Sequence, residues 1–103
     1  MLMNSKILTL LGFASKAGKL SFGMDMTAEA VVKRKSQLVI TADDVSGKSL
    51  KEITFFANKT NATVLTITGC DMQTLSHSVG HRCAILSVND KGFAEAILKE
   101  IGK

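Results

Sequence analysis

The chain of 103 residues is long enough for one compact domain and too short for two. Hydrophobic residues make up 46% of it, which excludes a disordered tail, and its apolar stretches are too short and interrupted to cross a membrane. We therefore expect a single domain over residues 1–103, without a signal peptide or a membrane anchor. Two cysteines do not make a disulfide framework, so a reducing cytoplasm is the expected location.

The net charge of +4 is unevenly distributed along the chain. Residues 1–35 hold six basic and two acidic residues, whereas the remainder holds seven of each. Such a local basic field suits a polyanionic partner, and ordinary solubility explains it equally well. If the first explanation holds, Lys16, Lys19 and Lys33 form one patch beside the second predicted helix.

Helical and strand character alternate through the first half of the chain. Ser5 is expected to cap the first helix, Gly18 to follow it as a left-handed C-terminal residue, and Ser49 with Glu52 to form a capping box for the third. The predicted elements are a helix at 5–16, a strand at 19–22, a helix at 23–35, a strand at 38–42 and a helix at 49–59.

The alternation continues to the end of the chain, where Asp90 is expected to cap the last helix and Gly80 to end the one before it. The predicted elements are a strand at 62–68, a helix at 71–79, a strand at 82–88 and a final helix after residue 90. Strands separated by helices imply right-handed crossovers. The expected fold class is therefore α/β, a three-layer α/β/α sandwich around a parallel or mixed sheet, with its loops as the binding surface.

Residues 42–49 (ADDVSGKS) fit a relaxed phosphate-binding-loop spacing between a strand and a helix. Three features speak against it. Ala42 stands where the first glycine belongs, Asp43 and Asp44 would repel phosphate in the cradle, and no later strand ends in the apolar run plus aspartate that holds magnesium. A nucleotide-hydrolysing enzyme is therefore the least favoured hypothesis.

Cys70, His77, His81 and Cys83 fall within one short stretch. Their spacing is not a standard zinc spacing, and a helix end at Gly80 would separate the two histidines. Neither histidine has a sequence-level reason to meet a thiol as a base meets its nucleophile. We expect no metal, no cofactor, no catalytic residue and no small-molecule substrate.

The start of the second predicted helix is the best candidate for a nucleic-acid contact. Gly23 would let a partner backbone approach closely, and the first free N–H groups of the helix attract phosphate. The chain has no tryptophan or tyrosine, so stacking on single strands is poorly supported and a folded RNA shape is the more suitable target. An ordinary helix remains an alternative, because Asp25 suits its positive end and Glu29 with Lys33 forms an i,i+4 pair.

Four runs of sequence carry a family resemblance: LGFASKAGKL at 11–20, LVITADD at 38–44, LSHSVG at 75–80 and GFA at 92–94. They resemble the kink-turn RNA-binding ribosomal protein family, which includes the archaeal and eukaryotic large-subunit proteins seven-Ae and thirty-e. The opening run is similar to that of the bacterial YlxQ-like branch. The resemblance covers nearly the whole chain and implies an α/β/α sandwich around a mixed four-stranded sheet.

The resemblance also implies a function, which is RNA binding without catalytic residues or a cofactor. Contacts would come from the loop before the second helix, the first turns of that helix, the loop after the strand at 38–42 and an apolar loop at 69–73. The implied contact residues are Lys19, Gly23, Met24, Asp25, Met26, Glu29, Lys33, Ser46, Lys48, Gly69, Cys70 and Asp71. The implied partner is structured RNA, including ribosomal RNA or the ribosome, bound by a monomer in the cytoplasm.

Three of these positions depart from the family's contact pattern, which is x-Asn-Glu-x-x-Lys after the glycine. The corresponding residues are Asp25, which has no amide donor, Met26, which cannot accept from a guanine edge, and Glu29, which is negative where a lysine would reach RNA. A good base contact is worth about 1–3 kcal/mol, so these departures predict weak kink-turn recognition. A protein–protein adaptor that kept the fold is the main alternative, with Met24, Met26 and Met72 as an adaptable apolar patch.

Overall fold

The computed structural model describes residues 2–101, and the side chains from residue 5 onward. Its elements, in chain order, are α1 (Leu2–Lys16), β1 (Leu20–Phe22), α2 (Gly23–Val32), β2 (Leu38–Ala42), α3 (Gly47–Thr60), β3 (Val64–Ile67), α4 (Met72–Val79), β4 (Ile85–Val88) and α5 (Lys91–Ile101). None of these helices is both long enough and apolar enough to span a membrane.

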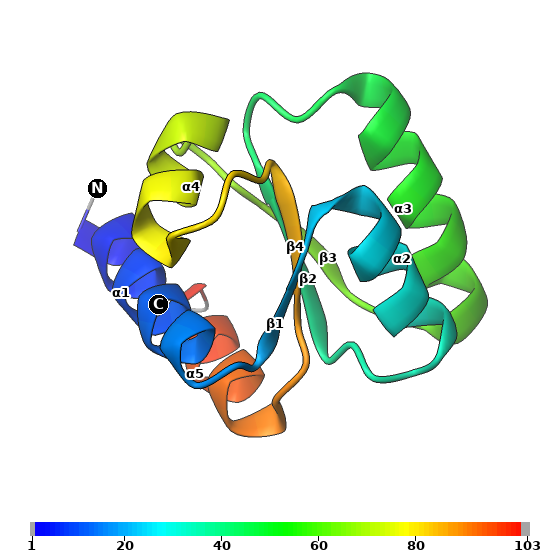
Figure 1. Cartoon of the computed structure of the whole chain (residues 1–103), viewed down its shortest axis with the longest axis horizontal. Coiled ribbons are helices and arrows are strands. Elements are labelled where there is room, and N and C mark those ends of the chain that lie inside the picture. Colours follow the sequence, from blue (N-terminus) through cyan, green and yellow to red (C-terminus); the bar gives the residue numbers. More distant parts are fainter. Residues whose placement is uncertain (1, 102–103) are drawn as a thin grey trace.

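The four strands form one mixed sheet in the order β1-β4-β2-β3. Strand β4 runs antiparallel to both of its neighbours, β1 and β2, whereas β2 and β3 are parallel. Helices α1, α4 and α5 cover one face of the sheet, and α2 and α3 cover the other (Figure 1). The predicted α/β/α sandwich is therefore confirmed.

Alternation along the central strand β2 builds a core on each face of the sheet. Leu38, Ile40 and Ala42 belong to the large cluster that also holds Leu11 of α1. Val39 belongs to a smaller cluster with residues of α2 and α3. All five residues of β2 are buried, which explains why this strand reads as a continuous apolar run.

Of the three predicted helix N-caps, two are wrong and one is confirmed. Helix α1 begins at Leu2, so Ser5 lies inside it, where its carbonyl oxygen accepts from Thr9 Oγ1 at 2.9 Å. Helix α3 begins at Gly47, because Ser46 is extended and its Oγ accepts from the Ser49 N–H at 3.1 Å; the expected capping box at Ser49 does not form. Asp90 does cap α5, accepting from the Phe93 N–H at 2.9 Å.

Four helices end on a residue with left-handed backbone. These residues are Gly18 after α1, as predicted, then Arg34, Asn61 and Gly80 after α2, α3 and α4. Helix α2 therefore stops at Val32, before the predicted end at residue 35. Glycine and asparagine are the residues that this position favours, which makes Arg34 the exception.

Candidate nucleic-acid interface

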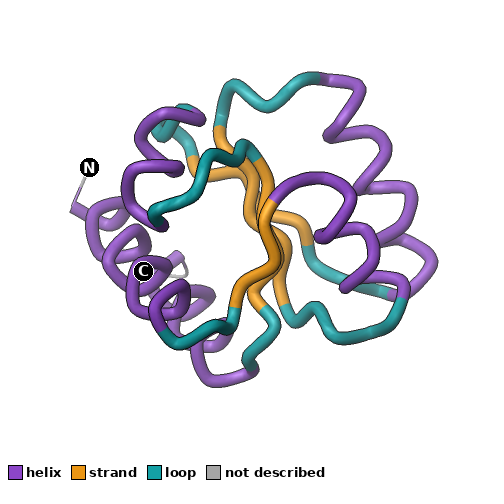
Figure 2. Tube along the Cα trace, viewed as in Figure 1, coloured by secondary structure: helices purple, strands orange, loops and turns teal. Residues whose placement is uncertain are grey.

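Four connections meet at one edge of the sheet, which we call the carboxyl edge. Strands β1, β2 and β3 all run toward it, because β4 is antiparallel to both β1 and β2, and β2 is parallel to β3. The edge is formed by residues 23–25, 43–46 and 68–71, together with residues 81–84, which lead into β4. Helices α2, α3 and α4 begin there, and the loops gather at this edge and at the opposite one (Figure 2).

The junction of β1 and α2 is an open part of the carboxyl edge. Gly23 has a φ of 85°, and a Cβ atom built on it would meet nothing within 4 Å. Phe22 precedes the helix in an extended conformation and supplies no side-chain cap to its first turn. The free N–H groups of α2 therefore face an unobstructed approach, which is what a phosphate-binding helix start requires.

The side chains of α2 that the sequence singled out differ in their surroundings. Met24 is half-buried against the α2–α3 cluster, whereas Met26 is 53% exposed and Asp25 is also exposed. Glu29 Oε1 accepts from Lys33 Nζ at 2.8 Å. That hydrogen bond, with the charge of Lys33, holds the pKa of Glu29 below its usual value. The pair neutralises Glu29 in part, so its repulsion of RNA is smaller than the sequence suggested.

Asp43 and Asp44 hold the β3–α4 connection in place. Asp43 Oδ2 accepts from the Gly69 N–H at 3.0 Å, and Asp44 Oδ1 accepts from the Met72 N–H at 2.8 Å. Both carboxylates thus have a structural role in this connection. They bind neighbouring backbone across the edge, and the start of α3 is already capped by Ser46.

Two further predicted contact residues on this connection have structural roles. Asp71 Oδ1 accepts from the Thr74 N–H at 2.8 Å and caps α4, and this backbone hydrogen bond lowers the pKa of Asp71. Cys70 is buried in the core, and its carbonyl oxygen accepts from the Asp43 N–H at 2.8 Å. Burial, followed by the nearby aspartates, raises the pKa of its thiol. The Cys70 side chain therefore cannot touch a partner unless the edge opens.

Sequence reasoning missed the contribution of the connection between α4 and β4. The imidazole of His81 stacks on the ring of Phe22, with ring centroids 4.1 Å apart and an interplanar angle of 11°. The stack braces the junction that leads to Gly23. Next to it, Arg82 lines a hollow of about 430 Å³ with Asp44, Asp71 and Met72. The sequence indicates only that His81 and Arg82 directly follow the helix-ending Gly80, and it carries no signal for the stack itself.

The basic residues of the first third do not form the predicted patch. Lys16 ends α1 and Lys33 follows α2, and these helices lie in opposite outer layers (Figure 1). Lys19 precedes β1, so it and Lys33 lie at the edge opposite the start of α2. Of the basic residues predicted to contact RNA, only Lys48, in the first turn of α3, lies at the carboxyl edge.

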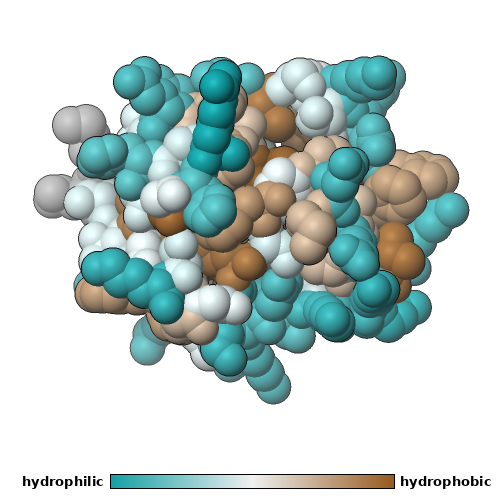
Figure 3. Space-filling model, viewed as in Figure 1, coloured by the Kyte–Doolittle hydropathy of each residue, from teal (hydrophilic) through white to brown (hydrophobic). Residues whose placement is uncertain are grey.

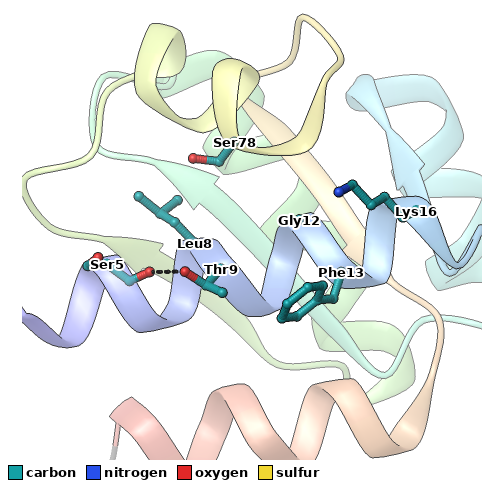
Figure 4. Close-up of a pocket in the computed structure, with 7 residues that line it drawn as sticks. All are labelled: Ser5, Leu8, Thr9, Gly12, Phe13, Lys16 and Ser78. Atoms are coloured by element: carbon teal, nitrogen blue, oxygen red, sulfur yellow. Dashed lines mark hydrogen bonds between the residues drawn. The ribbon is translucent and has the colours of Figure 1, made fainter.

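The groove between α1 and α4 lies apart from this edge. Leu8, Gly12, Phe13 and Lys16 of α1 line it together with Ser78 of α4, around about 380 Å³ (Figure 4). Gly12 makes the close packing possible, because a Cβ there would lie 3.1 Å from the Ser78 carbonyl oxygen. None of the predicted RNA-contact residues lines the groove, so we do not include it in the interface.

The four residues considered above as metal ligands do not gather at one place. Cys70 and Cys83 are buried free thiols, and His81 is stacked on Phe22. Within residues 2–101, no three cysteine, histidine or acidic side chains gather as a metal site requires. Burial also raises the pKa of the Cys83 thiol to about 11, so this thiol stays protonated near neutral pH.

Comparison with protein families matches residues 5–98 to the ribosomal protein L7Ae/L30e/S12e/Gadd45 family. The chain belongs to this family. The match covers all four strands and confirms the family resemblance that the sequence motifs indicated. Comparison with curated protein sequences finds no significant match.

Two solved structures share the fold over nearly their whole length. A protein of unknown function from Bacillus halodurans is 26% identical, with a TM-score of 0.88 over 95% of this chain and 98% of that one. The Giardia lamblia 15.5kD RNA binding protein is 13% identical, with a TM-score of 0.82 over 99% of this chain and 87% of that one. At 13% identity the second likeness shows the fold alone.

Proposed function

We propose that this chain is a non-catalytic RNA-binding protein that contacts structured, kink-turn-like RNA through its carboxyl edge. The observation that carries the proposal is the junction at Gly23, where a left-handed glycine, open space and an uncapped helix start coincide. Membership of a ribosomal protein family supports it, as does the fold shared with a Giardia protein that is named for RNA binding. On this proposal the chain acts as a cytoplasmic monomer associated with ribosomal RNA.

Recognition by this edge would depend on shape more than on base reading. Asp43 and Asp44 fix the relative position of two loops, and the His81 stack fixes the third. The exposed side chains on α2, by contrast, are poor partners for guanine edges. We therefore expect wild-type binding to a kink-turn to be weak and steeply salt-dependent, because phosphate contacts supply most of it.

The adaptor alternative loses support from the arrangement of its methionines. Met24 and Met72 are half-buried and packed against the two core clusters, which leaves Met26 as the exposed member. One exposed methionine is not a contiguous apolar patch. RNA binding is therefore the function that the carboxyl edge favours.

A charge reversal at Glu29 tests the proposal. Glu29→Lys removes a negative charge next to the first turns of α2 and should tighten binding to a kink-turn RNA hairpin by at least about tenfold at low salt. Glu95→Lys is the matched control, because Glu95 is exposed on α5 in the opposite layer. Equal effects of the two reversals would mean that the α2 surface does not face the RNA.

A further inference from the structure

The end of α2 has an arginine where the fold favours glycine. The Lys35 N–H donates to the Ala30 carbonyl at 2.8 Å, and the Arg34 N–H donates to the Val31 carbonyl at 3.0 Å. This double hydrogen bond requires a left-handed residue at position 34, and Arg34 has a φ of 61°. The other three left-handed helix ends use Gly18, Asn61 and Gly80. Backbone strain at a non-glycine residue is a reason to look for a function of its side chain.

Arg34 lies at the edge of the sheet opposite the carboxyl edge. We call this opposite edge the amino edge; it consists of residues 17–19, 33–37, 61–63 and 89–90. The Gln37 N–H donates to the Val88 carbonyl, and the Asn89 N–H donates to the Lys19 carbonyl, each at 2.8 Å. Lys19 and Gln37 therefore flank the end of β4, about 10 Å apart across two strand spacings. This brings Lys19 to the same edge as Arg34 and Lys35.

Three cations at this edge make no ion pair within residues 2–101, although, in addition to the hydrogen bond and charge of Lys33, the charge of Lys35 helps to lower the pKa of Glu29. Lys33 is paired with Glu29, and the other ion pair found within residues 2–101 joins Lys6 to Glu100. Lys19, Arg34 and Lys35 are all exposed. Their charge is therefore available to an external anion.

The loop that carries two of these cations is held by hydrogen bonds between neutral groups. Ser36 Oγ lies 2.7 Å from Ser87 Oγ, which is 2.6 Å from Asn89 Oδ1, and Asn89 Nδ2 donates to Ser21 Oγ at 2.8 Å. This chain of hydrogen bonds ties the 33–37 loop to β4 and β1. A fixed loop loses little conformational entropy when its charges bind a ligand.

Beside these cations lies a hollow of about 260 Å³ with a mostly polar lining. Arg34, Ser36, Gln37, Asn61 and Thr63 are among the residues that line it. Guanidinium, hydroxyl and amide groups match the phosphates and 2′-hydroxyls of RNA. The polar lining favours a nucleic acid over an acidic protein segment, which would also need apolar contacts.

We propose that the amino edge is a second RNA-binding surface, which holds the backbone of an RNA duplex without reading its sequence. Together with the carboxyl edge it lets one chain hold two RNA segments on opposite sides of the sheet. The bridging rests on the proposed function of the carboxyl edge, whereas duplex binding at the amino edge does not.

A titration with a plain RNA duplex of about 16 base pairs tests the amino edge by itself. Arg34→Gly combined with Lys35→Gln should weaken binding at least about tenfold at low salt and reduce the salt slope by about two. The control combines Lys51→Gln with Lys99→Gln, which removes two exposed charges from α3 and α5. Equal loss in both variants would overturn the proposal.

Two further variants and a second probe make the test specific. Arg34→Gly removes the side chain that strains the backbone, so an unchanged or higher melting temperature excludes unfolding as the cause of lost binding. Arg34→Lys keeps the charge and should retain most of the affinity. Polyglutamate should bind at least about tenfold more weakly than the duplex; binding as tight as that of the duplex would instead assign the surface to an acidic protein.

Capture on immobilised kink-turn RNA tests the bridging. Wild-type protein should retain a labelled duplex on the immobilised RNA, and the Arg34→Gly, Lys35→Gln variant should bind the kink-turn yet release the duplex. If the kink-turn is not bound but the duplex titration still depends on Arg34 and Lys35, the carboxyl-edge function fails and the amino-edge surface stands. Retention of the duplex by the variant would contradict the bridging.

Discussion

The two edges of the sheet use charged residues in opposite ways. At the carboxyl edge, Asp43, Asp44 and Asp71 accept hydrogen bonds from backbone N–H groups and shape the loops. At the amino edge, backbone bonds and the Ser36–Ser87–Asn89 chain shape the loops, and the cations Lys19 and Arg34 stay free. In the view of Figure 3, hydrophilic side chains protrude from both borders, the lower one where β1 and β2 begin and the upper one where these strands end.

The comparison shows that a basic segment of the sequence need not lie at the surface where an anionic ligand is expected to bind. In the sequence, the excess positive charge lies before and after α2. Because α2 runs from the carboxyl edge to the amino edge, the basic residues that directly follow it lie at the amino edge. The carboxyl edge thus has loops of defined geometry but little excess positive charge to attract RNA. The amino edge has positive charge to attract RNA but a less defined shape. The predictions below alter one edge at a time.

The largest expected effect comes from restoring base-reading groups at the carboxyl edge. Asp25→Asn, Met26→Glu and Glu29→Lys together should raise affinity for a kink-turn well beyond the effect of Glu29→Lys alone, on the order of a hundredfold, and make it depend on the tandem G·A pairs. Titration against a kink-turn and a mutant RNA without those pairs measures both. Failure of the triple variant to bind would mean that this surface is not the RNA site.

The braces of the carboxyl edge should contribute to stability. Changing both Asp43 and Asp44 to alanine leaves the Gly69 and Met72 N–H groups without their acceptors, and we expect a loss of about 1–3 kcal/mol in the free energy of unfolding. Chemical denaturation measures the loss, with Glu95→Ala as the surface control. Unchanged stability, together with unchanged amide exchange at Gly69, would show that the braces do not hold the loop.

The strained arginine of the amino edge predicts a change of opposite sign. Arg34→Gly should raise the free energy of unfolding by about 0.5–1 kcal/mol, because glycine adopts the left-handed backbone without a steric penalty. Asn61→Gly is the matched comparison at the end of α3 and should gain less, since asparagine tolerates this conformation. A clear loss of stability in Arg34→Gly would mean that the guanidinium serves the fold, and would weaken the case for a binding role.

Sequence periodicity predicted each helix and strand because apolar spacing follows the face that an element buries. Helix α3 shows the limit, since both Ser46 and Ser49 can cap and only the observed backbone at Ser46 decides between them. The family motifs located Gly23 and the adjoining loops. They could not show that Asp43 and Asp44 reach across to another loop, because those partners are 26 and 28 residues away. Likewise, no local pattern reveals that His81 stacks on Phe22.

The thiols beneath the carboxyl edge report whether that edge opens. Burial raises the pKa of both Cys70 and Cys83, the latter to about 11, so both stay protonated near pH 8 and should react with a thiol reagent far more slowly than in the unfolded chain. Modification of the thiols should become faster only when the pH rises toward their raised pKa or when the carboxyl edge opens. Rapid modification of the native protein at pH 8 would show that the edge is not closed.

The smallest expected effect concerns Lys48 at the start of α3. Lys48→Ala should leave ATP and GTP binding unchanged at the undetectable level expected for wild type, since Ser46 already caps the helix start. Calorimetry with magnesium and nucleotide is the measurement. Saturable micromolar binding that disappears in the variant would revive the nucleotide-binding hypothesis.

The central claim, that the two edges meet RNA separately, is tested most directly by following backbone amide resonances of the 11.0 kDa chain during titration with kink-turn RNA. With a short kink-turn hairpin, the account predicts the first and largest shifts at Gly23, Asp25 and Gly69. Shifts at Lys19, Arg34 and Lys35 should follow when a plain duplex is added. Shifts confined to the amino edge with both RNAs would contradict the assignment of the carboxyl edge as the kink-turn surface.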